Sequence, residues 1–104
     1  MNDIYFTITG TNFRYGHEFF EPGQQVRLIR DPDNEYDKEA IKVEMAGLGQ
    51  VGWVANSVGT VLGESHSAGW LYEKIFDNTT GTVVYVLPRG VVCKLDTTVS
   101  DYLK

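Results

Sequence analysis

Residues 31–54 read DPDNEYDKEAIKVEMAGLGQVGWV, and this stretch decides the fold. From Ala40 to Met45 apolar and charged residues alternate, which is typical of a β-strand with one buried face. Gly47-Leu48-Gly49 then favours a turn, and Gln50 to Val54 supply a short partner strand. The stretch therefore predicts a β-hairpin, entered through an acidic turn in which Pro32 imposes an extended or turn conformation.

Four further segments have the composition of β-strands. They cover residues 4–9 (IYFTIT), 26–29, 82–88 (TVVYVLP) and 91–95, and each is rich in β-branched or aromatic residues. Turns that contain glycine or proline separate them, and the last two segments are expected to pair antiparallel across Pro88-Arg89-Gly90.

Between the hairpin and the last two strands the spacing becomes helical. Val58, Val61 and Leu62 lie three and four residues apart, with Asn56 or Ser57 available as a cap, which predicts a short helix over 55–62. A second weakly helical stretch is expected over 70–77. Six short strands with a small helical insertion predict an all-β, OB-like barrel whose helices close one end.

Length and composition favour a single small domain. The chain has 104 residues, 42% of them hydrophobic, so we expect one domain over 1–96 and a polar C-terminal tail over 97–104. The net charge of −5 argues against a generic binder of polyanions.

Cys93 is the only cysteine, which excludes an intrachain disulfide. The N-terminus does not have a signal-peptide pattern and no stretch is long enough to span a bilayer, so we expect a cytoplasmic protein without membrane contact.

Acidic residues at alternate positions raise the question of a metal site. An extended chain would place five carboxylates on one side, where together they form a candidate calcium site. These carboxylates belong to Asp31, Asp33, Glu35, Asp37 and Glu39. The order fails that of an EF-hand, which needs glycine at position 36 and glutamate at position 42, so a solvated acidic turn is the preferred interpretation. We expect neither a metal nor a cofactor.

Zinc and catalytic sites lack a complete set of groups. A zinc site would require His17, His66 and Cys93 to converge with a carboxylate. Ser65 and His66 are adjacent, but no third group that would orient them is identifiable. A hydrolase that uses Asp37 with one of the histidines is the last-ranked hypothesis, and no phosphate-binding P-loop pattern is present. We therefore predict no catalytic residues.

Several aromatic residues lie beside polar ones and admit two interpretations. Exposed rings form platforms on which unpaired bases stack, whereas buried rings fill a core. The residues concerned are Phe13, Tyr15, Tyr36, Trp53 and Tyr85.

Three motifs in order resemble the HIRAN domain. They are residues 8–16 (ITGTNFRYG), residues 31–43 (DPDNEYDKEAIKV) and residues 49–54 (GQVGWV), so that the resemblance covers about residues 4–95. It implies an OB-like barrel, found in eukaryotic fork-remodelling ATPases and as small free-standing bacterial proteins of this size. The fused forms capture the 3′ end of single-stranded DNA, which implies a role in DNA repair or replication.

The resemblance also implies roles for individual residues. Tyr36 would stack on the terminal base or sugar, Asp37 would accept the proton of the 3′-hydroxyl, and Phe13 would form the opposing wall. Trp53, Asn56 and Tyr85 would line the rest of the pocket. The implied nucleic-acid-binding residues are thus Asn12, Phe13, Arg14, Tyr36, Asp37, Trp53, Asn56 and Tyr85.

The chain departs from the pattern at basic positions. Asn12 and Asn56 stand where the DNA-binding members carry basic residues, which leaves Arg14, Arg27, Arg30, Lys38, Lys42 and Arg89 to hold phosphates. Residues 63–69 also form a longer stretch than in the eukaryotic forms, which would reshape or cover one side of the pocket.

Two hypotheses follow. The first is a non-catalytic module that binds the 3′ end of single-stranded DNA weakly and in a salt-sensitive way. The second is a protein-interaction adaptor, in which the acidic surface or an exposed strand edge binds a partner protein and the pocket is vestigial.

Overall fold

The computed structural model describes residues 3–11 and 18–96. Three of the predicted site residues, Asn12, Phe13 and Arg14, lie outside these ranges, as do His17 and the expected tail over 97–104.

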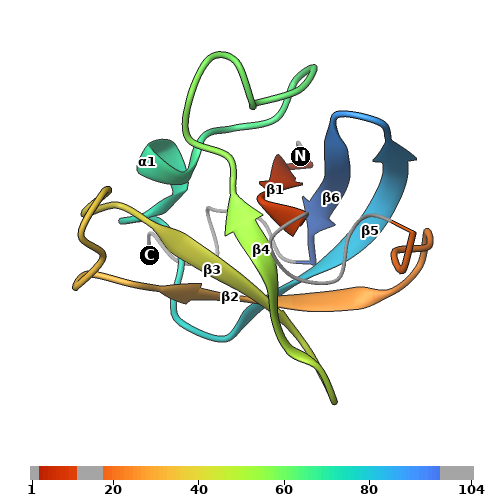
Figure 1. Ribbon diagram of the computed structural model, residues 1–104, viewed down its shortest axis with the longest axis horizontal. Helices are drawn as coiled ribbons and strands as arrows, with labels where there is room; N and C mark the ends of the chain where they lie inside the picture. Colours follow the sequence, from red (N-terminus) through yellow and green to blue (C-terminus); the bar gives the residue numbers. More distant parts are fainter. Residues whose placement is uncertain (1–2, 12–17, 97–104) are drawn as a thin grey trace.

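Six antiparallel strands close into a barrel (Figure 1). Their order around it is β1, β4, β3, β2, β5, β6, so each strand pairs with two neighbours, which confirms the predicted all-β, OB-like architecture. Closure removes the free edges that a sheet would offer, so the described strands contain no edge for the strand-addition form of the adaptor hypothesis. The elements are β1 (Tyr5–Thr9), β2 (Gln25–Arg30), β3 (Ile41–Met45), β4 (Gly49–Val54), α1 (Ala68–Leu71), β5 (Thr79–Leu87) and β6 (Gly90–Leu95).

Apolar side chains from the inward face of each strand fill the barrel interior. On β2 and β3 the inward residues Val26, Leu28, Ile41 and Val43 are fully buried, as the sequence pattern indicated, whereas Met45 at the end of β3 is only partly buried. α1 and the segment before β5 add apolar residues to the same core. The buried cluster comprises Phe6, Ile8, Phe20, Val26, Leu28, Ile41, Val43, Val51, Val54, Ala68, Leu71, Ile75, Val83, Val91, Cys93 and Leu95.

The predicted hairpin of β3 and β4 is confirmed, and a bulge interrupts its pairing. Val43 pairs with Gly52 and Glu44 with Gln50, so Val51 is the extra residue on β4. Beyond the bulge, Trp53 pairs with Lys42 on one side and with Thr9 of β1 on the other. The end of β4 therefore carries its aromatic residue beside the connection that follows β1.

The helix predicted over 55–62 is wrong. The segment forms a single turn in which Val61 N donates to Ser57 O at 3.0 Å, and the Ser57 and Thr60 hydroxyls lie 2.9 Å apart. It does not continue because Leu62 N donates to the buried hydroxyl of Thr7 in β1 at 3.1 Å, a long-range bond that replaces the next helical one. Gly63 then takes a φ of +56°.

α1 begins earlier and is shorter than the helical stretch predicted over 70–77. Ser67 caps its N-terminus, since the Ser67 hydroxyl accepts from Trp70 N at 3.2 Å. After Leu71 the chain continues as turns, with Lys74 N donating to Leu71 O at 2.8 Å. Within the described residues, no helix has the length and apolar character needed to cross a membrane.

Candidate functional site

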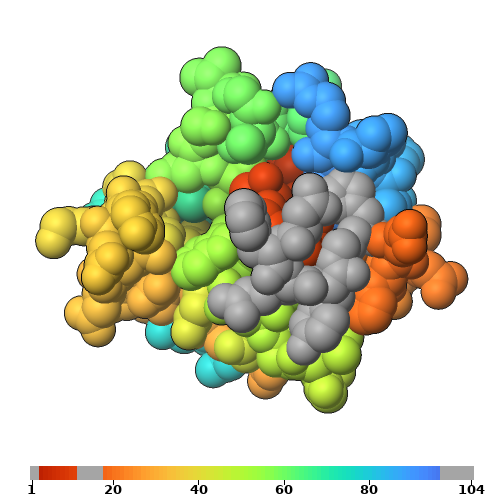
Figure 2. All heavy atoms as spheres, in the orientation of Figure 1, coloured from red at the N-terminus to blue at the C-terminus, as the bar shows by residue number. Residues whose placement is uncertain are grey.

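A depression of about 580 Å³ lies between the β2–β3 loop and the end of β4. It unites four of the predicted site residues, Tyr36, Asp37, Trp53 and Asn56, and we refer to it as the Tyr36 pocket. Figure 2 shows the β2–β3 loop, in yellow, as a lobe that projects from the barrel beside the green segment after β4. The full lining is Thr9, Asn34, Tyr36, Asp37, Ala40, Trp53, Val54, Asn56, Ser57 and Thr60.

Asn34 gives the β2–β3 loop its shape. Its side-chain Oδ1 accepts hydrogen bonds from Tyr36 N and Asp37 N, each at 2.9 Å, which forms an Asx turn. At the base of the loop, Asp31 N donates to Ala40 O at 2.8 Å and so closes it. The loop holds Tyr36 outward, with 92% of its surface exposed.

Asp37 lies within a network that joins three segments. Its Oδ1 accepts from Glu39 N at 2.9 Å, and its Oδ2 accepts from Asn56 Nδ2 at 2.7 Å. The Asn56 Oδ1 in turn accepts from Gly69 N of α1, also at 2.7 Å. The carboxylate is therefore fixed by the loop, by the connection after β4 and, through Asn56, by α1.

Gly69 lies close to two polar side chains. A Cβ there would lie 2.8 Å from Glu39 Oε1 and 3.2 Å from Asn56 Oδ1. The exposed Glu39 side chain can turn away, so the tighter constraint comes from Asn56, whose Oδ1 accepts from Gly69 N.

Trp53 is positioned by a second glycine. Gly10 has a φ of +73°, and a Cβ on it would lie 2.9 Å from Trp53 Cδ1. The indole therefore packs directly on the backbone after β1, where it is half-buried and forms one wall of the pocket.

Tyr85 lies apart from the other predicted residues. It is 60% exposed and lines a second depression of about 380 Å³. The predicted stretch 63–69 contributes to this second depression through Gly63, Glu64 and Ser65. The full lining is Tyr5, Leu62, Gly63, Glu64, Ser65, Tyr85, Leu87 and Val92.

Sequence reasoning did not single out Asn34, Ser57 and Thr60 as parts of the pocket. Asn34 carried a signal that was available, because an Asn two residues before an exposed aromatic residue in an acidic turn is typical of an Asx turn. No sequence signal pointed to Ser57 and Thr60, because the helix predicted over 55–62 gave no reason to place their side chains in a pocket.

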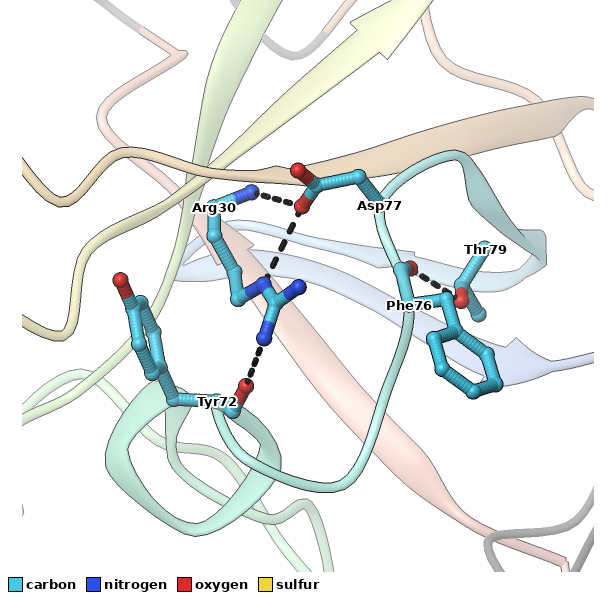
Figure 3. A network of polar contacts seen from close by, with 5 residues as sticks. All are labelled: Arg30, Tyr72, Phe76, Asp77 and Thr79. Carbon is cyan, nitrogen blue, oxygen red and sulfur yellow. Dashed lines mark hydrogen bonds and ion pairs between the residues drawn. The ribbon is translucent and has the colours of Figure 1, made fainter. Parts of the chain in front are cut away.

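Three of the arginines that were candidates for phosphate contacts, Arg27, Arg30 and Arg89, are engaged within the protein, and the fourth, Arg14, lies outside the described residues. Arg30 Nε donates to Asp77 Oδ1 at 3.2 Å, and its Nη1 donates to Tyr72 O at 3.4 Å (Figure 3). Arg27 pairs with Glu44 at 3.3 Å, and Arg89 donates to a backbone carbonyl at 3.0 Å. Lys38 and Lys42 make no ion pair within residues 3–11 and 18–96.

Arg30 also affects the ionisation of its partner. Its backbone N–H donates to Asp77 Oδ1 at 2.9 Å, and this bond, aided by the guanidinium, lowers the pKa of the Asp77 carboxyl. Asp77 therefore stays ionised at neutral pH and holds Arg30 away from the Tyr36 pocket.

The described residues contain no group of three or more His, Cys, Asp and Glu side chains arranged to hold a metal. The Ser65 hydroxyl is buried and has no hydrogen-bond partner among them, so Ser65 and His66 do not form a nucleophile and base pair. Asp37 receives its bonds from Glu39 and Asn56, not from His66.

Two solved structures are similar to this fold. One is the crystal structure of the HIRAN domain of human HLTF, with a TM-score of 0.59 and 20% sequence identity, covering 90% of this chain and 74% of that chain. The other is a protein from Lactobacillus plantarum, with a TM-score of 0.55 and 16% identity, covering 92% of this chain and 98% of that chain. At these identities the likeness concerns the fold. No curated protein matches the chain.

The sequence itself matches the profile of the HIRAN domain over residues 1–99. The match includes all the motifs on which the resemblance depends and all six strands of the barrel. This chain therefore belongs to the HIRAN domain family.

Proposed function

We propose that this protein is a non-catalytic DNA-binding module that receives the 3′ end of a single strand in the Tyr36 pocket. The observation that carries the proposal is the exposed ring of Tyr36, 92% accessible, next to a carboxylate held in place by Asn56. A large ring kept in water by a hydrogen-bonded loop is typical of a contact surface and not of a core. The family membership supports the same ligand class, in DNA repair or replication.

Asp37 has the chemistry to recognise a free 3′-hydroxyl. An ionised carboxylate has about four lone-pair sites, and the structure fills one on each oxygen. The remaining lone pairs would accept a hydrogen bond from a terminal hydroxyl. A terminal phosphate in the same place would be repelled, so the carboxylate would distinguish a strand end from the interior of a strand.

Tyr36 and Trp53 would supply the contact with the base. Stacking of an unpaired base on an aromatic side chain contributes roughly 1 to 3 kcal/mol and depends little on sequence. Trp53 is fixed against Gly10, so little conformational freedom is lost when a base enters.

Charge limits the affinity. The net charge is −5, and Arg27, Arg30 and Arg89 each make an ion pair or hydrogen bond with another residue of the protein. Few phosphates are therefore neutralised, and each one contacted lowers the logarithm of the binding constant by roughly 0.7 per tenfold rise in salt. The proposed binding is therefore weak, and its salt sensitivity is limited to that of the few phosphates contacted.

The test compares two exposed tyrosines. Fluorescence anisotropy with a 5′-labelled single-stranded oligonucleotide is measured for wild type, Tyr36→Ala and Tyr85→Ala. The proposal predicts that Tyr36→Ala weakens binding by about 5- to 100-fold, the equivalent of one lost stacking contact, and that Tyr85→Ala leaves it near wild type. Unchanged binding by a folded Tyr36→Ala variant would contradict the proposal.

A further inference from the structure

The geometry points to a second nucleotide subsite beside the Tyr36 pocket, formed by the stacked rings of His66 and Trp70, with Lys74 lying against the Trp70 ring outside the lining itself. It would receive the nucleotide on the 5′ side of the terminal one. This inference rests on the proposed function and extends it, because it fixes the direction in which the strand leaves the pocket.

The proposed subsite lies in a depression that shares part of its lining with the Tyr36 pocket. A third depression, of about 490 Å³, lies against the Tyr36 pocket, and Asn56 and Ser57 line both. A ligand in one therefore continues into the other across the connection after β4. Both volumes lie within the roughly 300 to 1,000 Å³ typical of ligand sites. The third depression is lined by Asn56, Ser57, Val58, Val61, Ser65, His66, Ser67 and Trp70.

A preformed aromatic stack lies in this depression. The rings of His66 and Trp70 are 3.7 Å apart between centroids and inclined by only 16°. Both residues are half-exposed, and the backbone holds each in place: His66 N donates to Tyr5 O at 2.8 Å, and Trp70 N donates to the Ser67 hydroxyl. Rings fixed in this way present an aromatic surface to a base at little entropic cost.

Lys74 adds a cation next to the stack. Its Nζ lies 4.6 Å from the centroid of the Trp70 ring and donates to Trp70 O at 3.2 Å. In contrast to Arg27 and Arg30, it makes no ion pair with any residue in 3–11 or 18–96. An ammonium without a carboxylate partner, beside aromatic rings, matches the combination of charge and stacking that single-stranded nucleic acids require.

The opposite direction is unfavourable for a phosphate backbone. On that side the β2–β3 loop exposes Asp33 and Glu35 to solvent. A strand that left the pocket across this loop would place its phosphates next to those carboxylates, whereas a strand that crosses Ser57 enters the depression lined by Trp70, beside which Lys74 lies.

The test is the dependence of affinity on ligand length. Calorimetry is performed with thymidine 5′-monophosphate and with thymidine oligonucleotides of two and four residues, all ending in a 3′-hydroxyl. We expect wild type to gain about tenfold in affinity from one residue to two. Lys74→Gln and His66→Ala should reduce the gain to threefold or less while leaving the mononucleotide affinity unchanged. Lys94→Gln is the matched control, because Lys94 is also half-buried and lines neither depression but, unlike Lys74, does not lie against the Trp70 ring.

Two further results separate stacking from folding and the subsite from the proposed function. His66→Phe, which keeps an aromatic ring, should restore the length-dependent gain that His66→Ala loses. If wild type binds all three ligands equally and loses all of them on Tyr36→Ala, the subsite is refuted and the proposed function stands. If no ligand binds to wild type, both are refuted.

Discussion

Asn56 and Asp37 are nineteen residues apart in sequence, yet the Asn56 amide donates to the Asp37 carboxylate over 2.7 Å. The same side chain accepts from Gly69 N, so Asn56 connects the β2–β3 loop to α1. The resemblance to DNA-binding relatives suggested a basic residue at this position. In this chain the residue at this position orients a carboxylate instead.

Replacement of Asn56 tests this connection. Asn56→Ala removes both hydrogen bonds, so we predict a loss of about 1 kcal/mol in the free energy of unfolding and a three- to tenfold loss in affinity for a 3′-hydroxyl end. The readouts are urea denaturation and anisotropy. Gln25→Ala is the control, because Gln25 donates to the Asp96 carboxylate at 3.4 Å on an exposed surface outside the pocket. Equal effects of the two variants on affinity would refute a role for Asn56 in the site.

Gly10 provides a test of how Trp53 is positioned. Gly10→Ala combines an unfavourable positive φ with a contact 2.9 Å from Trp53 Cδ1. Gly49→Ala has nearly the same φ, +77° against +73°, and meets no atom within 4 Å. We predict that both variants lose about 1 kcal/mol of stability from backbone strain and that only Gly10→Ala also loses DNA affinity. The measurement is the unfolding midpoint together with oligonucleotide binding, and a loss of affinity in both variants would count against the Trp53 contact.

The barrel was predictable because its strands carry local signals. The alternation from Ala40 to Met45 and the turn at Gly47 depend only on near neighbours, and both appear in the structure. The predicted helix over 55–62 failed for the opposite reason. The hydroxyl of Thr7, 55 residues away in sequence, accepts a hydrogen bond from Leu62 N. No local sequence pattern indicates such a long-range bond.

The candidate site shows the same division. The resemblance brought Tyr36, Asp37, Trp53 and Asn56 to one pocket, because the motifs that carry them flank a single hairpin and its entry loop. It did not show that Tyr85 lines another depression. It also did not reveal the stack of His66 on Trp70, which depends on the path of the chain between β4 and α1.

The Asp77 carboxyl predicts a pH dependence of stability. Because the hydrogen bond from Arg30 lowers the pKa of Asp77 in the folded state, its contribution is present above the unfolded value near 3.8 and is lost as the pH falls through the folded value. Asp77 is half-exposed, so screening limits this to about 0.5 kcal/mol. The unfolding free energies of wild type and Asp77→Asn should therefore differ at pH 7 and converge as the pH falls below 3.8. A constant difference across that range would contradict the assignment.

Cys93 predicts slow thiol chemistry in the folded state. Burial in the barrel, aided by the nearby Asp96 charge, raises the pKa of the Cys93 thiol to about 12. At pH 8 almost no thiolate is present, so a thiol-specific chromogenic reagent should react only as fast as the protein unfolds. The measurement compares reaction rates with and without denaturant, and rapid labelling of the native protein would show that the core is open at this position.

The most direct test of the account compares two strand ends. Wild type and Asp37→Asn are titrated with otherwise identical single-stranded oligonucleotides that end in a 3′-hydroxyl or a 3′-phosphate. The account predicts that wild type prefers the hydroxyl end by about tenfold or more, and that Asp37→Asn loses most of this preference because the repulsion of phosphate disappears. Equal affinity of wild type for the two ends would contradict the account.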